Sequence, residues 1–150
     1  VDAPALADVV AEPEGDPLAD WLESHRRFLE LPDDVLVLPA HNTPFYGLHA
    51  RLRYLIAHHE DHLAALEEAC VTPRTVRELL PVIFRRTLDP EQTTLALGEC
   101  IAHLNFLLHA GRVRCEPGAD GLHRYIAPAP AVAARAGRVT HQRDDDPLMV

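Results

Sequence analysis

A single histidine, His41, directly follows a run of branched apolar residues and has the setting of a metal ligand. The four residues 35–38 read Val-Leu-Val-Leu, a pattern typical of a short strand buried on both faces. Pro39 has no N–H to donate to a sheet, so it ends the strand, and Asn42 tolerates the left-handed backbone that a sharp turn needs. An imidazole on such a turn can bind a metal ion. The alternative is a turn histidine that hydrogen-bonds to the backbone.

Three further histidines, His58, His59 and His62, lie together in one predicted helix. His58 and His62 are four residues apart, so their imidazoles can hold one metal ion between adjacent turns. His59 falls in the centre of the apolar stripe of this helix, and His58 and His62 flank it beside acidic residues. The alternative is therefore a half-buried histidine with solvated neighbours, at which only adventitious metal binding by His58 and His62 is expected.

Composition excludes several classes of function. The net charge of −9 argues against general binding to nucleic acid or to anionic membranes. All 14 basic residues are arginine, which with abundant Ala and Pro indicates a GC-rich bacterial genome. The cysteines, Cys70, Cys100 and Cys115, are odd in number and form no CxxC pair. We interpret them as small core residues in a reducing, cytoplasmic setting.

The expected fold class is mainly α with a small amount of β. Helix starts are predicted from N-cap and capping-box patterns at Asp16-Pro17, Thr75-Val76-Arg77-Glu78 and Asp89-Pro90. Pro81 is expected to end or kink the second of these helices, and Gly111 to end the third. The predicted elements are an extended or disordered segment 1–15, a helix from 16 to about 31, the strand 35–38, helices 48–70, 75–81 and 89–111, a hairpin of strands 113–115 and 122–126, and a disordered tail 128–150.

The helix that ends at Gly111 is predicted to carry a second, outer face opposite its core stripe. Leu95, Glu99 and Phe106 lie on that face, and it contains no arginine. DNA recognition needs concentrated positive charge, so this face is not expected to bind DNA. Its apolar residues Leu95 and Phe106 instead favour contact with another protein surface.

The sequence also resembles a known family over roughly residues 12–126. The motifs that carry the resemblance are Asp16-Pro17-Leu18 with Trp21-Leu22, residues 35–41, Gly47-Leu48-His49-Ala50-Arg51, Ala57-His58-His59-Glu60, Val76-Arg77-Glu78-Leu79-Leu80-Pro81, Leu97-Gly98-Glu99, Ala102-His103-Leu104 and Gly111-Arg112-Val113. In this order they resemble the C-terminal portion of a metallo-β-lactamase-superfamily hydrolase of the β-lactamase-like-protein-2 type. The resemblance implies that residues 1–45 are the C-terminal edge of an αββα metallo-β-lactamase domain and residues 46–127 a winged-helix domain.

The resemblance further implies a site of two zinc ions in the complete enzyme, with His41 as its last ligand. Such enzymes hydrolyse ester, thioester or lactone bonds, or RNA phosphodiesters. The family usually has Gly on both sides of this histidine, whereas Ala40 and Asn42 stand here, and no His-x-His motif occurs in the chain. Because one imidazole cannot fix two metal ions, we expect the fragment to bind no zinc and to be inactive alone.

The expected partners are the missing N-terminal metallo-β-lactamase domain or a second copy of the chain, and neither DNA nor a membrane. The alternative is a stand-alone, non-enzymatic winged-helix module for protein interaction, in which the strand 35–38 merely packs on the helices. An HxHxDH motif upstream in the native protein would decide for the hydrolase.

Overall fold

The computed structural model describes residues 6–40 and 42–128 as five helices followed by a two-stranded antiparallel sheet. The elements are α1 (Leu6–Ala11), α2 (Pro17–Phe28), α3 (Leu48–Ala69), α4 (Val76–Ile83), α5 (Pro90–His109), β1 (Arg114–Pro117) and β2 (His123–Ile126). The predicted fold class, mainly α with a small amount of β, is confirmed, as is the order of helix, short helix, long helix and hairpin. Within the described ranges, no helix combines the length and apolar character needed to cross a bilayer.

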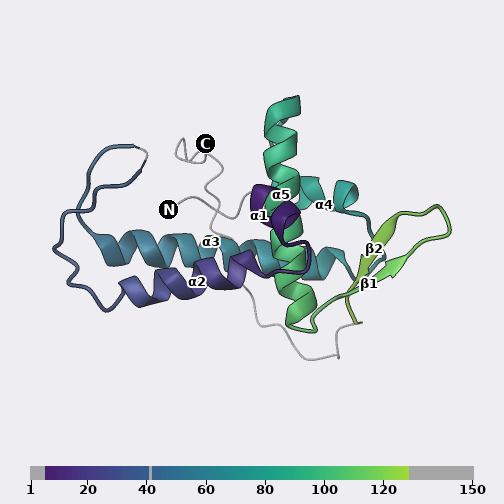
Figure 1. Cartoon of the computed structure of the whole chain (residues 1–150), viewed down its shortest axis with the longest axis horizontal. Helices are drawn as coiled ribbons and strands as arrows, with labels where there is room; N and C mark the ends of the chain where they lie inside the picture. Colours follow the sequence, from purple (N-terminus) through teal and green to yellow (C-terminus); the bar gives the residue numbers. More distant parts are fainter. Residues whose placement is uncertain (1–5, 41, 129–150) are drawn as a thin grey trace.

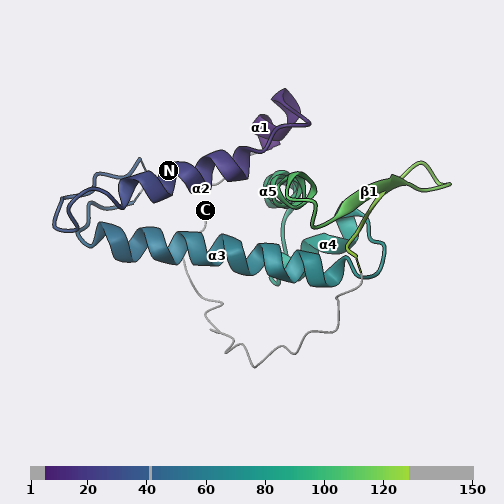
Figure 2. The same ribbon diagram turned by 90° about the horizontal axis from the view of Figure 1, so that it is seen from below.

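The helices form a crossed arrangement rather than a parallel bundle. α2 and α3 lie side by side, and α5 crosses α3, as both Figure 1 and Figure 2 show. The loop between α2 and α3 lies at one end of the molecule and the β1–β2 hairpin at the other (Figure 1). The crossing brings the middle of α3 against the middle of α5, and this contact positions the candidate site.

Side-chain caps start the helices where the sequence predicts. The Asp16 carboxylate accepts a hydrogen bond from the Ala19 N–H at 3.0 Å, and the Asp89 carboxylate accepts one from the Gln92 N–H at 2.8 Å. In each helix a proline occupies the first position, where no N–H is needed. At the other end of α5, Gly111 has φ +65°, the left-handed conformation that ends a helix at little cost for glycine.

The capping box of α4 allows a first prediction, for Thr75→Ala. Glu78 donates its N–H to Thr75 Oγ1 at 3.4 Å, and the Glu78 carboxylate accepts the Thr75 N–H at 2.8 Å. Loss of the hydroxyl should lower the free energy of unfolding by about 1 kcal/mol. Urea denaturation would measure this change. Thr87→Ala, in the exposed stretch before α5, is the control and should change stability by less than about 0.5 kcal/mol; equal effects would refute the capping argument.

Apolar side chains from α2, α3, α4, α5 and the hairpin form one core. The fully buried members include Leu18 and Leu22 of α2, Leu66 of α3, Leu79 of α4, and Leu104 and Leu107 of α5. Cys70 and Cys100 are fully buried and carry free thiols, as expected of small core residues. Burial raises the pKa of Cys100 to about 12, which removes the thiolate needed for reactivity.

The hairpin is anchored to the helices by main-chain bonds. β1 pairs with β2 from Arg114 opposite Ile126 to Pro117 opposite His123. Arg74, in the loop after α3, exchanges backbone hydrogen bonds with Tyr125 at 3.2 and 2.8 Å. These backbone hydrogen bonds attach the hairpin to the helical core.

The predicted strand at residues 35–38 is wrong. These residues form only one isolated bridge, in which Val37 exchanges backbone hydrogen bonds with Phe45 at 2.9 and 3.1 Å. Leu36 and Leu38 are 51% and 74% exposed, so the segment is not buried on both faces. A strand of that kind needs neighbours on each side, and the described part of the chain supplies only the return of the same loop. The predicted left-handed Asn42 is confirmed, at φ 69°.

Two further expectations fail in detail. Residues 6–11, expected to be extended or disordered, form α1, which packs on α5 and buries Val9. Pro81 does not end α4, because the helix continues to Ile83 and the Phe84 N–H bonds to the Leu80 carbonyl at 2.9 Å. The alternative, a kink at Pro81, stays a prediction. Residues 1–5, His41 and 129–150 lie outside the described residues, and with them the expected tail.

Candidate functional site

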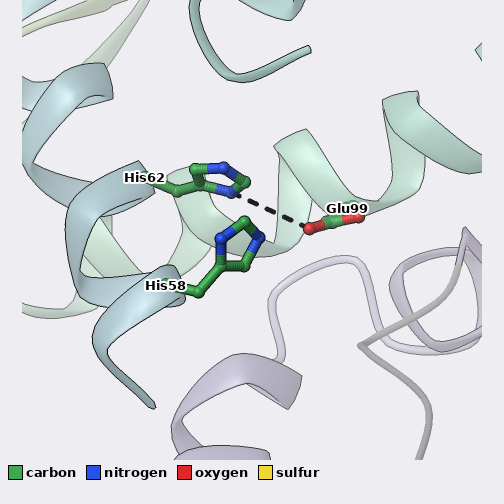
Figure 3. Close-up of side chains that lie close together, drawn as sticks. All are labelled: His58, His62 and Glu99. Carbon is green, nitrogen blue, oxygen red and sulfur yellow. Dashed lines mark ion pairs between the residues drawn. The ribbon is translucent and has the colours of Figure 1, made fainter. Parts of the chain in front are cut away.

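Five side chains meet where α3 and α5 cross. We call them the His/Glu cluster, which consists of His58, His59 and His62 from α3 and Glu99 and His103 from α5. Both sets follow helical spacing: His58 and His62 are one turn apart on α3, and Glu99 and His103 are one turn apart on α5. In Figure 3 the Glu99 carboxylate points from α5 toward the imidazoles of His58 and His62.

The inner part of the cluster is a chain of hydrogen bonds between the two helices. His103 Nδ1 lies 2.7 Å from the Glu99 carbonyl oxygen, and His103 Nε2 lies 3.0 Å from His59 Nδ1. Because the carbonyl can only accept, His103 Nδ1 carries the proton, and neutral His103 must then accept at Nε2 from His59. The rings of His59 and His103 are both buried, at 3% and 0% exposure. These hydrogen bonds set the position of the Glu99 turn of α5 relative to α3.

The outer part of the cluster contains polar atoms that converge without a short hydrogen bond. The rings of His58 and His62 have centroids 4.1 Å apart, and His62 Nδ1 lies 3.9 Å from Glu99 Oε1. Among the described residues, neither His62 Nδ1 nor Glu99 Oε1 has a hydrogen-bond partner, although both atoms are buried. Two polar atoms so placed lose their hydration without recovering it.

Burial opposes charge on His59, His62, His103 and Glu99 of this cluster. Burial, followed by the imidazole of His103, lowers the pKa of His59 to about 3, and burial, followed by His58, lowers that of His62 to about 2. Burial also lowers the pKa of His103 to about 4, against the hydrogen bond to the Glu99 carbonyl, and raises that of the Glu99 carboxyl to about 7. At neutral pH the three imidazoles are therefore neutral bases, and Glu99 is close to its titration point.

Two subsets of the cluster bring three ligand atoms together. One consists of His58, His62 and Glu99, and the other of His59, Glu99 and His103; in each, the three ligand atoms lie within 4.8 Å of one another. The second subset already uses His59 and His103 to bond each other. Neutral imidazole nitrogens with a carboxylate oxygen are the donors that zinc and similar divalent ions prefer. The side chains of His62 and Glu99 are only 14% and 15% exposed, so the site is nearly closed to solvent.

The sequence-predicted site residues are only partly brought together. His58 and His62 lie side by side as the helical spacing predicts, but they are partly buried and not solvated flanks. The three residues predicted to share an outer face of α5 do not form one exposed surface. Leu95 is 54% exposed, Glu99 faces α3, and Phe106 packs against the core. His41 lies outside the described residues.

Sequence reasoning missed Glu99 and His103 as members of this site. Their four-residue spacing was a usable signal, because it places both side chains on one face of α5. The sequence did not show that this face turns toward α3 instead of toward solvent. Part of the expected outer surface is in fact covered, since Asn105 and His109 bond to the backbone carbonyls of residues 13–15 that follow α1.

Comparison with known proteins gives the family. Residues 63–128 match the family model described as "Metallo-beta-lactamase-like, C-terminal domain". The structure is similar to that of a beta-lactamase domain protein from Burkholderia ambifaria, with a TM-score of 0.76 and 44% identity over 79% of this chain and 35% of that one. The chain contains the C-terminal portion of a metallo-β-lactamase-superfamily protein. A metallo-beta-lactamase family protein from Thermus thermophilus is also similar, with a TM-score of 0.62 and 30% identity over 75% of this chain and 34% of that one.

The metallo-β-lactamase-like C-terminal domain covers only part of the cluster. Glu99 and His103 lie inside the matched residues 63–128, whereas His58, His59 and His62 of α3 come just before the match begins. The chain spans about a third of the length of both similar structures. No curated protein matches the chain significantly.

Proposed function

We propose that this chain is the C-terminal part of a zinc-dependent hydrolase in which the catalytic half is a separate metallo-β-lactamase domain. In the complete enzyme, His41 would be the last ligand of a two-zinc site that cleaves ester, thioester or lactone bonds or RNA phosphodiesters. Residues 46–127 would form the winged-helix domain that packs on the catalytic domain and shapes substrate access. The family resemblance and the similarity to a beta-lactamase domain protein support this proposal.

The observation that carries the proposal is an uncovered apolar stretch around His41. Leu36, Leu38 and Tyr46 are 51%, 74% and 69% exposed, and they flank the turn that contains the left-handed Asn42. Large apolar side chains exposed together in one segment are typical of a surface that contacts another protein. A covering catalytic domain would complete the sheet that residues 35–38 do not form here, and it would place His41 at the edge of that sheet.

The chain does not supply the ligand set of a two-zinc centre by itself. It contains no His-x-His motif, and a single imidazole cannot fix two metal ions or lower the pKa of bound water. The role of this chain in the reaction is therefore to add one ligand and to position the wall of the substrate site. The bond-breaking chemistry belongs to the complete protein.

The test compares this chain alone with the same chain preceded by a metallo-β-lactamase domain that carries HxHxDH. Thioester, lactone and RNA substrates would be assayed with zinc. The longer protein should hydrolyse one of these substrate classes, this chain alone none, and His41→Ala in the longer protein should lower kcat/KM by at least about 100-fold. The control His123→Ala, on the exposed side of β2, should leave the rate unchanged.

Three results would contradict the proposal. Zinc-dependent hydrolysis by the 150-residue chain alone would show that it carries its own catalytic site. Full activity of the longer protein after His41→Ala would remove His41 from the metal centre. If the longer protein hydrolyses nothing, the stand-alone interaction module becomes the better interpretation.

A further inference from the structure

We propose that His58, His62 and Glu99 form a separate binding site for one zinc or similar divalent transition-metal ion, which links α3 to α5. This site differs from the two-zinc centre of the proposed function, because it uses none of the His41 turn and lies wholly within the helical core region. The inference does not depend on the proposed hydrolase activity.

The ligand spacing within α3 is the first argument. His58 and His62 stand four residues apart on one helix, the spacing at which two imidazoles of a helix bind one zinc ion in His-x-x-x-His motifs. Their rings are 4.1 Å apart between centroids. The pair therefore provides two nitrogen ligands from a rigid element, and only the third ligand has to come from elsewhere.

Glu99 provides that third ligand from the neighbouring helix. Its Oε1 lies 3.9 Å from His62 Nδ1, and the three ligand atoms lie within 4.8 Å of one another. Zinc with bonds of about 2.0 Å in tetrahedral geometry holds its ligand atoms roughly 3.3 Å apart. A contraction of about half an ångström between His62 Nδ1 and Glu99 Oε1, within reach of small side-chain rotations, would bring these two atoms to the spacing that the ion requires.

The unsatisfied atoms are the second argument. His62 Nδ1 and Glu99 Oε1 are buried and have no hydrogen-bond partner among the described residues. Native proteins pair nearly all such groups, and an unpaired one calls for an explanation such as a bound ion. A metal ion between them would satisfy both atoms at once and would neutralise the buried carboxylate.

The hydrogen bonds that connect His59, His103 and the Glu99 carbonyl are the third argument. His59 and His103 bond each other at 3.0 Å, and His103 bonds the Glu99 carbonyl at 2.7 Å. These bonds hold the Glu99 turn of α5 against α3, in the way that outer contacts orient the ligands of known metal sites.

His59 occupies the position where zinc peptidases carry a glutamate base, and its Nδ1 is already hydrogen-bonded to His103. With ligand side chains only 14% and 15% exposed, the site suits a structural ion and not catalysis.

The experiment is a titration of the untagged 150-residue chain, stripped with chelator, with Zn²⁺ and Co²⁺. Calorimetry should show one equivalent of metal bound. The Co²⁺ spectrum should indicate nitrogen and oxygen ligands, without thiolate charge-transfer bands. At a free metal concentration of about 100 times Kd, the melting temperature should rise by roughly 10 °C. His62→Ala and Glu99→Gln should each weaken binding by on the order of 100-fold or more. Circular dichroism would establish that both variants are folded.

Matched controls separate this site from the other histidines. His41→Ala and His123→Ala should bind metal as the unaltered chain does. Absence of a stoichiometric site in the unaltered chain would overturn the proposal, and this result needs no variant. Tight binding that survives in folded His62→Ala or Glu99→Gln, or that is lost in His41→Ala, would overturn it as well. Because the titration needs no hydrolysis, failure here leaves the proposed function untouched, and failure of the hydrolase assay leaves this site untouched.

Discussion

Acidification from pH 6.5 to 4.5 is expected to lower the free energy of unfolding of the metal-free chain by about 5 kcal/mol. The cause is the group of buried imidazoles at the crossing of α3 and α5. The pKa values of His59, His62 and His103 fall to about 3, 2 and 4 in the folded chain, against about 6.5 when unfolded. A loss of this size approaches the whole stability of an ordinary domain, so the chain should unfold near the acid end of this range.

The sign follows from the protons bound in each state. In the middle of this range, the unfolded chain carries nearly three protons on these histidines that the folded chain does not. Glu99 acts in the opposite direction, because its pKa of about 7 keeps one proton on the folded chain that the unfolded chain has lost. The net difference of two protons gives a slope of about 2.7 kcal/mol per pH unit. The imidazole contribution is complete above about pH 6.5, whereas the cost of ionising Glu99 accumulates from about pH 4.5 and is complete above about pH 7.

Urea unfolding in the presence of chelator, at half-unit steps from pH 4.5 to 7.5, measures this slope. His62→Leu removes one of the three titrating groups and should lower the slope by about 1.4 kcal/mol per pH unit. His123→Ala, an exposed histidine on β2, should leave it unchanged. A stability that stays constant from pH 4.5 to 6.5 would show that the imidazoles are solvated in solution.

Leu104→Ala is expected to destabilise the chain by about 2–5 kcal/mol. Leu104 is fully buried on α5 and belongs to the core cluster that joins α2, α3, α4 and α5. Alanine removes three carbon atoms, and the surrounding helices cannot close the cavity because each is held by its own caps and contacts. Chemical denaturation would measure the change.

Leu95→Ala is the matched control, because it makes the same substitution on the same helix. Leu95 is 54% exposed, so its truncation should change stability by less than about 0.5 kcal/mol. If both substitutions cost the same, Leu95 must also be covered in solution, by a second copy or by another surface. This comparison therefore also tests what remains of the predicted contact face on α5.

Local chemistry made some parts of this molecule predictable. The helix starts at Asp16, Thr75 and Asp89 depend on side chains that bond backbone groups three residues away, and Gly111 ends α5 through its own backbone freedom. Such interactions are complete within a few residues, so they can be identified in the sequence. The shared face of His58 and His62 was predictable for the same reason.

Other parts depended on partners that the local sequence does not identify. Residues 35–38 have the composition of a buried strand, yet they form a single bridge, because a strand requires neighbours that lie elsewhere in the chain or in another domain. Residues 6–11 lack a strong helical pattern, yet they form α1 because α5 offers a surface against which Val9 is buried.

The sequence by itself determined the starts of the capped helices, the fold class and the family resemblance that the comparisons support. Only the tertiary structure decided that Glu99 and His103 face His58, His59 and His62. The rotation of α5 about its axis depends on how the apolar side chains of four elements pack together, and no local spacing specifies it. Glu99 was assigned to the solvent side from its own helix, whereas the crossing of α3 and α5 buries it beside His62.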